Sequence, residues 1–329
     1  MSILVTGGAG YIGSHTVLEL TQHKERVVVI DSLVKGHRDA VLNAPLHAVD
    51  IRDTAMVTRI LQEYEVDTVV HFAASSLVGE SVSNPLKYYD DNVCATERLL
   101  SAMVTTGIKR IVFSSTAATY GEPMSTPITE DHPTVPTNPY GETKLAIERM
   151  LAWSYQAYGL QSISLRYFNA AGSHLSLPIG EDHHPETHLI PVVLQVPLGK
   201  RDHVTVYGQD YPTQDGTCVR DYVHVMDLAS AHRLAVERLR TEVVQTEVFN
   251  LGIGQGFSVN EVINTARKVT GHAIEVEIGN RRAGDPAVLV ASSERAKRVL
   301  GWEPAYTDLS TMIASAWKFH QDHQDGYGH

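Results

Sequence analysis

The sequence predicts an α/β protein, with a doubly wound parallel Rossmann sheet and a smaller mixed α/β substrate domain. Short β-branched runs alternate with helical patterns through the first half of the chain. This alternation is typical of parallel strands that are covered by helices on both faces. A glycine-rich turn follows the first run, at residues 7–13. From about residue 172 the pattern dissolves into Pro, His and Asp and resumes near residue 219, which indicates a second unit.

The elements follow from these runs in chain order. The expected strands of the first half are residues 3–6, 26–31, 47–50, 68–72, 110–114 and 162–167. In the second half we expect strands at 219–225 and 249–251 and helices near 227–239, 259–270 and 292–300. We therefore predict a Rossmann domain over residues 1–171, with later segments returning to its sheet, and a second domain that comprises most of residues 172–329.

The composition is that of a globular protein and excludes several classes of partner. The chain has 329 residues, of which 43% are hydrophobic and 20% charged, enough to bury a core. The net charge of -11 argues against a nucleic-acid partner, which normally needs a basic patch. Two cysteines, Cys94 and Cys218, make no disulfide framework, and no signal peptide or membrane span is visible. We expect a cytoplasmic protein.

The glycine-rich turn predicts a dinucleotide site. Gly7, Gly10 and Gly13 form G-x-x-G-x-x-G between the first strand and a helix that begins near Tyr11 and Ile12. Without Cβ atoms, this turn lets a pyrophosphate approach the backbone N–H groups at the start of the helix.

The second strand ends in a carboxylate, which favours NAD as the cofactor. Asp31 lies 18 residues after Gly13 and can accept hydrogen bonds from ribose hydroxyls. The 2′-phosphate of NADP would meet a like charge there, although Lys35 and Arg38 nearby could soften this preference.

Two further strand ends are candidates for contact with the cofactor. Asp50 and Ile51 follow the third strand and could hold and cover the adenine. Phe72, Ala73 and Ala74 end the fourth strand, where small residues would let the cofactor pass close to the backbone. Ordinary strand-end packing would explain either group equally well.

The chemistry is predicted by Tyr140 and Lys144, which lie one helical turn apart. A phenol has a pKa of about 10 in water, so it needs a neighbouring positive charge to act as a base at neutral pH. Lys144 and an oxidised nicotinamide would both favour the tyrosinate. At the end of the fifth strand, Ser114, Ser115 and Thr116 offer hydroxyls to a sugar hydroxyl, and Thr116 is the expected partner of Tyr140.

In this order the motifs resemble the extended short-chain dehydrogenase/reductases, and within them the bacterial UDP-glucose 4-epimerases. The narrower resemblance rests on motifs spread over nearly the whole chain: 78–81, Asn92, 165–169, 210–213, 219–225 and Arg282-x-Gly284-Asp285. It implies a bound NAD that takes a hydride from C4 of a UDP-hexose. The expected reaction interconverts UDP-galactose and UDP-glucose, as in galactose metabolism.

The resemblance also assigns roles that composition cannot. It places Asn92 and Tyr167, with Ser114, Ser115, Tyr140 and Lys144, at the cofactor. It implies that the UDP part of the substrate is held by Asn169, Arg220, Arg282 and Asp285, with His188, Leu189 and Tyr207 lining the pocket. Guanidinium groups suit a diphosphate because they donate paired hydrogen bonds. From the residues alone, pairing of Arg220 with Asp221 or another acid is the competing interpretation.

Three departures from the family pattern bear on activity. Thr116 replaces a Ser of some members and keeps the hydroxyl, whereas Ser76 replaces a Lys that contacts the cofactor in some relatives. Leu289 replaces a large Tyr beside C2 of the sugar. A UDP-N-acetylglucosamine 4-epimerase or an enzyme of dual specificity is therefore an alternative.

Other classes of function stay open at this point. A nucleotide-sugar 4,6-dehydratase would need an acidic pair where Ala117 and Ala118 stand. A non-catalytic NAD-sensing protein and an oxidoreductase that releases NADH are the remaining rivals. The expected reaction needs no metal, so we assign His183 and His184 to a solvated loop and residues 320–329 to a frayed tail. Apolar residues on more than one face of 92–104 and 145–158 fit either burial inside a monomer or packing on a partner, and the family resemblance implies a homodimer through these helices.

Overall fold

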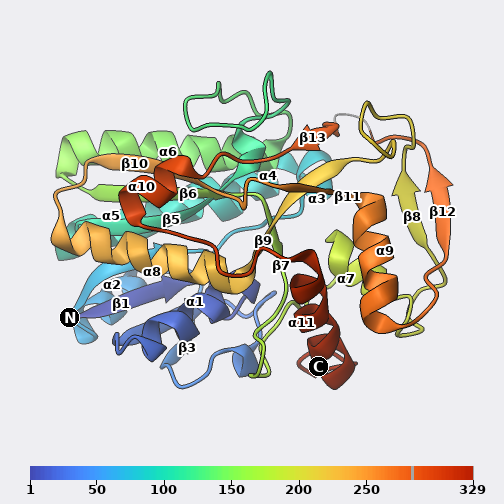
Figure 1. The fold of residues 1–329 in the computed structure, drawn as a ribbon. Helices are drawn as coiled ribbons and strands as arrows, with labels where there is room; N and C mark the ends of the chain where they lie inside the picture. The colour runs from blue at the N-terminus through green and yellow to red at the C-terminus, as the bar shows by residue number, and fades with distance from the viewer. Residues whose placement is uncertain (283–284, 329) are drawn as a thin grey trace.

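A seven-stranded parallel sheet forms the centre of the computed structural model, which describes residues 1–282 and 285–328 (Figure 1). The strand order is β10-β6-β5-β4-β1-β2-β3. The bounds of these strands are β1 Ser2–Thr6, β2 Val27–Asp31, β3 Leu46–Ala48, β4 Val66–His71, β5 Arg110–Thr116, β6 Gln161–Tyr167 and β10 Thr246–Leu251. The order reverses between β1 and β4, which is the switch point of a Rossmann sheet. The predicted fold class is confirmed.

Helices cover both faces of this sheet and produce two apolar cores. On one face, α1 (Tyr11–Gln22), α8 (Val225–Thr241) and α10 (Glu294–Leu300) bury a cluster that includes Val17, Leu228 and Trp302. On the other, the cluster draws on α2 (Thr54–Glu63), α5 (Ala95–Thr106) and α6 (Pro139–Tyr158). Strands of a sheet covered on both sides must be apolar throughout, which explains why the β1 and β2 side chains are all buried.

The second half of the chain builds a smaller mixed α/β unit beside the carboxyl ends of the strands (Figure 1). Its main sheet pairs β9 (Val219–His224) with β7 (Asn169–Ala171), β11 (Gly256–Ser258) and β13 (Val288–Leu289), and β8 (Val204–Tyr207) pairs with β12 (Val276–Gly279). Helices α7 (Leu189–Leu194), α9 (Val259–Thr270) and α11 (Leu309–Asp322) pack around a third apolar cluster. Short elements α3 (Val78–Ser83), α4 (Pro85–Tyr88) and a π-helical turn (Tyr89–Cys94) precede α5.

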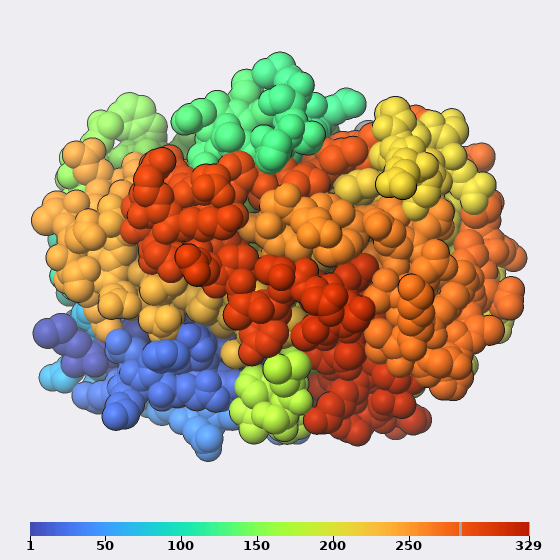
Figure 2. Space-filling view, viewed as in Figure 1, coloured from blue at the N-terminus to red at the C-terminus, as the bar shows by residue number. Residues whose placement is uncertain are grey.

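Two expectations about the second half are corrected by the structure. The region near 172–216 was expected to be irregular, but it contains α7 and β8. The tail beyond α11 does not fray within the described residues. The Tyr327 ring stacks on His37 with centroids 4.8 Å apart, and its N–H donates to Asp182 at 3.0 Å. In Figure 2 the yellow-green segment after β7 lies between the blue N-terminal part and the dark red C-terminal helix. His329 and Gly284 lie outside the described residues.

No helix among residues 1–282 and 285–328 has the length and apolarity that crossing a membrane requires.

Candidate active site

The glycine turn lies at the end of β1 and closes tightly on its neighbours. Gly7 has φ +70°, a left-handed conformation that favours glycine, and an added Cβ would lie 2.5 Å from the backbone N of Ala73. At Gly13 an added Cβ would lie 2.2 Å from the carbonyl O of Gly7. Helix α1 begins at Tyr11 as predicted, and no side chain caps its N-terminus. Free N–H groups at a helix start suit a pyrophosphate, so these residues fit a dinucleotide.

Asp31 ends β2 next to this turn and supports it. Its carboxylate accepts hydrogen bonds from the N–H of Ala9 at 3.0 Å and of Leu33 at 2.8 Å. Each oxygen has a second lone pair, so acceptance from a ribose hydroxyl is compatible with these bonds. Burial raises the pKa of Asp31 above its usual value.

The three predicted catalytic side chains converge beyond the carboxyl end of β5. Ser114 and Thr116 point to one face of the strand because side chains alternate along it. Nζ of Lys144 donates to the carbonyl O of Ser114 at 2.9 Å and lies 5.9 Å from the centre of the Tyr140 ring. The Thr116 hydroxyl accepts from the N–H of Ala118 at 3.1 Å, and its interaction with Tyr140 favours a lower pKa of that phenol. Ser114 also contacts the hydroxyl of Tyr167, its neighbour at the end of β6.

The electrostatics of this group differ from the expectation. Burial raises the pKa of Tyr140 to about 12, and the hydrogen bond with Thr116 opposes this rise. Burial also lowers the pKa of Lys144 to about 7, against the attraction of Glu148. In the protein alone, desolvation therefore outweighs the expected activation of Tyr140 by Lys144. Desolvation disfavours both the phenolate and the ammonium, which explains the opposite directions of the two shifts.

A buried ion pair behind the catalytic side chains was missed by the sequence reasoning. Ser115 points away from Thr116, and its hydroxyl donates to Oε1 of Glu148. Nε of Arg166 donates to the same oxygen at 2.9 Å, and the guanidinium and carboxylate side chains are 6% and 8% exposed. The available signal was that Glu148 stands one helical turn after Lys144 on α6. The pair thus fixes the helix face that carries Lys144.

The remaining cofactor candidates are Asn92 with the residues at the end of β4, and Asp50 with Ile51 beyond β3. Asn92 is fully buried and joins the loop after β4 to α6, because its side chain accepts from the N–H of Ser75 at 2.8 Å and donates to Thr143 at 3.0 Å. The N–H groups of Phe72 and Ala73 both donate to the carbonyl of Thr6. This brings the end of β4 against the glycine turn. Ala74 is exposed.

Asp50 and Ile51 lie beyond β3, which ends two residues earlier than predicted. The Asp50 carboxylate pairs with Arg52 at 2.7 Å, and Ile51 is buried in the core with Leu4 and Val57. Their contacts within the protein are those of ordinary strand-end packing.

The predicted diphosphate residues lie together on the second unit. Arg220 pairs with Asp285, and its Nη1 donates to the carbonyl of Val219 at 2.8 Å. Of the competing interpretation, the pairing of Arg220 with Asp221 is wrong, but its pairing with another acid is confirmed, because that acid is Asp285. Asp221 is fully buried and accepts backbone N–H groups from residues 253, 254 and 291. This role was missed, and burial raises the pKa of Asp221 to about 7.

Three further substrate candidates, Arg282, Tyr207 and Asn169, also belong to the second unit. The guanidinium of Arg282 lies 4.0 Å from the centre of the Tyr207 ring, which is 39% exposed at the end of β8. The Asn169 amide donates to the carbonyl of Asp221 at 3.2 Å and so faces the strand that carries Arg220. Arg282 has no ion pair with another residue that the structure describes, which leaves its charge available to a ligand.

His188 and Leu189 lie where α7 begins, and the assignment of the preceding loop is corrected. His188 Nδ1 contacts Glu181, which also lies 3.2 Å from Nδ1 of His183. The His183 side chain is 29% exposed and carries an acidic partner, so it does not belong to a solvated loop. His184 is exposed, as expected.

Comparison with known proteins agrees with this arrangement. Residues 4–315 match the family described as GDP-mannose 4,6 dehydratase. A UDP-glucose 4-epimerase from Halalkalibacterium halodurans is 59% identical over 327 residues, which make up 99% of this chain and 98% of that protein. The chain belongs to the UDP-glucose 4-epimerase family. The resemblance found in the motifs is confirmed.

Solved members of the UDP-glucose 4-epimerase family share the fold over their whole length. One crystal structure of a UDP-glucose 4-epimerase has a TM-score of 0.98 at 50% identity and covers 100% of both chains. The enzyme from Bifidobacterium longum, solved in complex with NAD+ and UDP, has a TM-score of 0.94 at 38% identity, covering 99% of this chain and 100% of that one.

Proposed function

We propose that the chain catalyses the reversible interconversion of UDP-galactose and UDP-glucose with bound NAD. The observation that carries the proposal is the group of Thr116, Tyr140 and Lys144 at the carboxyl edge of β5, on the same sheet as β1 and its glycine turn and separated from β1 by β4. Membership of the UDP-glucose 4-epimerase family supports it.

Each side chain has a distinct role in this proposal. NAD, when bound, supplies the acceptor for the hydrogen at C4 and a positive charge that favours the phenolate of Tyr140. Tyr140 then removes the proton from O4, and Thr116 donates a hydrogen bond to the same oxygen. Lys144 is held by the Ser114 carbonyl where its charge can act on both the phenol and the cofactor. After the keto-sugar turns over, Tyr140 returns the proton to O4 while C4 regains the hydride, so the cycle has no net oxidation.

The turnover of the sugar requires firm contacts far from C4. We assign them to Arg220 and Arg282, with Asn169, His188, Leu189, Tyr207 and Asp285 around them. Arg220 uses part of its five N–H donors on Val219 and Asp285, so others stay free for the diphosphate. Strong binding remote from the reacting carbon leaves the hexose free to expose either face.

Dehydration at C5 and C6 is disfavoured by the residues beside Thr116. That reaction needs an added acid and base, but Thr116 is followed by Ala117 and Ala118 in a single 3-10 turn. Activity on N-acetylated UDP-hexoses is the second candidate function. Leu289, which replaces a larger Tyr of some relatives, pairs with Arg220 in the β13–β9 register and would leave a wider sugar pocket. Such a pocket would also admit the N-acetyl group of UDP-N-acetylgalactosamine.

The decisive assay incubates purified protein with UDP-galactose, without added NAD, and analyses the sugar nucleotide. We expect UDP-glucose, and we expect Tyr140→Phe to lower turnover by about 10²–10⁴-fold while NAD stays bound. Recovery of unchanged UDP-galactose from NAD-loaded protein would refute the proposal, and a 4-keto-6-deoxy sugar would show a dehydratase. Conversion of UDP-N-acetylgalactosamine would establish the dual specificity.

The proposal includes a cytoplasmic homodimer assembled through α5 and α6. Trp153 on α6 is 70% exposed, which is unusual for so large an apolar side chain. Light scattering of the protein and of Trp153→Glu would test this, and a monomeric wild-type protein would contradict it.

A further inference from the structure

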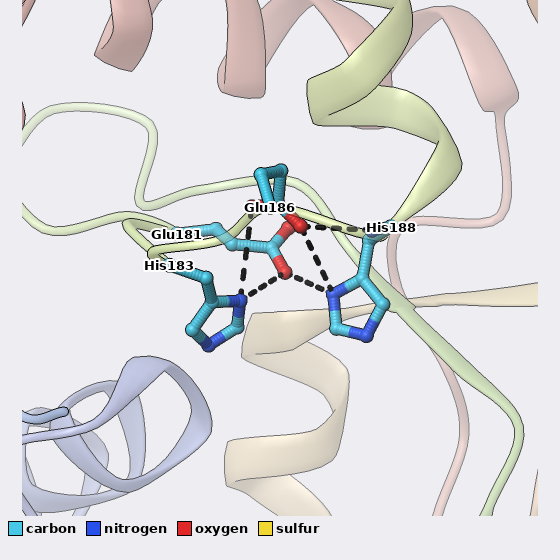
Figure 3. A group of neighbouring side chains, drawn as sticks. All are labelled: Glu181, His183, Glu186 and His188. Carbon is cyan, nitrogen blue, oxygen red and sulfur yellow. Dashed lines mark hydrogen bonds and ion pairs between the residues drawn. The ribbon is translucent and has the colours of Figure 1, made fainter. Parts of the chain in front are cut away.

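Four side chains of the loop between β7 and α7 converge on one point (Figure 3). They are Glu181, His183, Glu186 and His188, and one nitrogen or oxygen atom of each lies within 4.8 Å of those of the others. Both histidines direct Nδ1 at the same oxygen of Glu181. Nδ1 of His183 is 3.7 Å from Glu186 Oε2, and Nδ1 of His188 is 4.0 Å from Glu186 Oε1.

The carboxylates of this cluster need a positive charge close by, which either protonated histidines or a bound cation would supply. The side chains of Glu181 and Glu186 are only 4% and 7% exposed. Within the described residues, no Lys or Arg forms an ion pair with either carboxylate, and the histidines are their only ionic partners. Buried carboxylates are costly unless a positive charge is close. A divalent cation with two neutral imidazoles would neutralise both carboxylates at once.

The donor set and the spacing fit zinc. Zn²⁺ prefers four nitrogen, sulfur or oxygen ligands in a tetrahedron, with bonds of about 2.0–2.2 Å, so ligand atoms should lie about 3.3–3.6 Å apart. Separations of 3.2, 3.7 and 4.0 Å are close to that requirement. Nδ1 of His188 is in direct hydrogen-bond contact with Glu181, so these two atoms would have to move apart to bind the ion. We propose that Glu181, His183, Glu186 and His188 bind a structural Zn²⁺ ion.

The four ligands come from one short stretch of sequence. It reads E-x-H-x-x-E-x-H from residue 181 to 188, two copies of one short pattern. In extended backbone, residues two apart point to the same side, so each Glu is grouped with its His. Four ligands from the protein leave no open position, which distinguishes a structural zinc site from a catalytic one.

The ion would tie together parts of the molecule that surround the proposed cofactor site. The His183 ring lies edge-on to Tyr11, the first residue of α1, with centroids 6.2 Å apart. His37 Nε2 lies 3.0 Å from the carbonyl of Asp182, and Lys35 donates to the carbonyl of His184. His188 directly precedes α7. Zinc would therefore hold the loop in one conformation across the glycine turn and at the start of α7.

The test measures metal content on full-length protein without a histidine tag. After expression with ZnCl₂ and dialysis, mass spectrometry of the metals should find about one zinc per chain in the wild type. The variants His183→Ala and His188→Ala should each retain at least about five-fold less zinc than the wild type. His184→Ala removes an exposed histidine of the same loop and should retain the wild-type content.

A second measurement uses only the wild type, so it does not depend on the folding of the variants. Chelator-treated protein should melt several degrees lower, recover with ZnCl₂ but not with MgCl₂, and show the visible absorption of tetrahedral Co²⁺ when given cobalt. The proposal is overturned if the wild type binds no zinc, if His183→Ala and His188→Ala bind as much as the wild type, or if His184→Ala loses as much as they do.

Discussion

Replacing Lys144 by Met should stabilise the protein while damaging its chemistry. Burial lowers the pKa of Lys144 from its ordinary value of 10.5 to about 7. At about 1.4 kcal/mol per unit, keeping this ammonium buried costs about 5 kcal/mol where it is fully protonated. The cost is fully present below about pH 7 and is lost as pH rises toward 10.5, because only the unfolded chain binds the proton in that window.

The expected change in the free energy of unfolding follows from the cost of the buried ammonium at each pH. The cost falls from about 5 kcal/mol at pH 6 to about 2 kcal/mol at pH 9. Met also removes the hydrogen bond from Nζ to the Ser114 carbonyl, which offsets about 1–3 kcal/mol at either pH. The substitution should therefore raise the free energy of unfolding by about 2–4 kcal/mol at pH 6 and change it little at pH 9.

Urea unfolding of nucleotide-free protein at both pH values measures this difference. The matched control is Lys109→Met, an exposed lysine whose Nζ also donates to a backbone carbonyl, that of Tyr158 at 2.8 Å. It should show no such change between the two pH values. Equal effects of Lys144→Met at pH 6 and pH 9 would mean that burial does not penalise the ammonium, and the reasoning would fail.

Two other substitutions probe the framework of the site. Glu148→Gln breaks the buried pair with Arg166 and should lower the free energy of unfolding, measured by urea unfolding, by about 3–5 kcal/mol. A loss below about 1 kcal/mol would show that the pair is dispensable for stability. Gly13→Ala places a Cβ 2.2 Å from the Gly7 carbonyl and must shift the turn. Co-purifying NAD should therefore fall, whereas Gly79→Ala, with no atom within 4 Å of the added Cβ, should keep it; equal NAD content in the two variants would contradict the proposed cofactor site.

The sheet could be predicted because its signals are local. Apolar runs and the glycine turn placed β1 and β2 within a residue of their observed bounds, and helix α9 was predicted at its observed residues 259–270. The proximity of the three candidate catalytic residues could be predicted because Tyr140 and Lys144 share one helix face and Thr116 ends a strand. Resemblance, rather than spacing, assigned the residues expected at UDP.

The missed features are mostly contacts between distant residues. Glu148 and Arg166 are 18 positions apart, and Asp221 receives N–H groups from residues at least 32 positions away. No local sequence pattern predicts which distant residues will be in contact. The pKa of Tyr140 was misjudged because burial depends on the whole fold. The loop from Glu181 to His188 is different. Its repeated Glu-x-His pattern is local and visible in the sequence, but the prediction for this loop is a solvated segment.

Strand β10 has a consequence for how the molecule folds. It comes from residues 246–251 but completes the large sheet by pairing with β6 in parallel register. A fragment that ended at residue 171 would leave the backbone N–H and C=O groups of β6 unpaired along its outer side. Exposed edges of this kind recruit strands from other molecules. The backbone groups of β6 are therefore paired only after most of the chain has been synthesised, and β10 then forms this edge of the sheet.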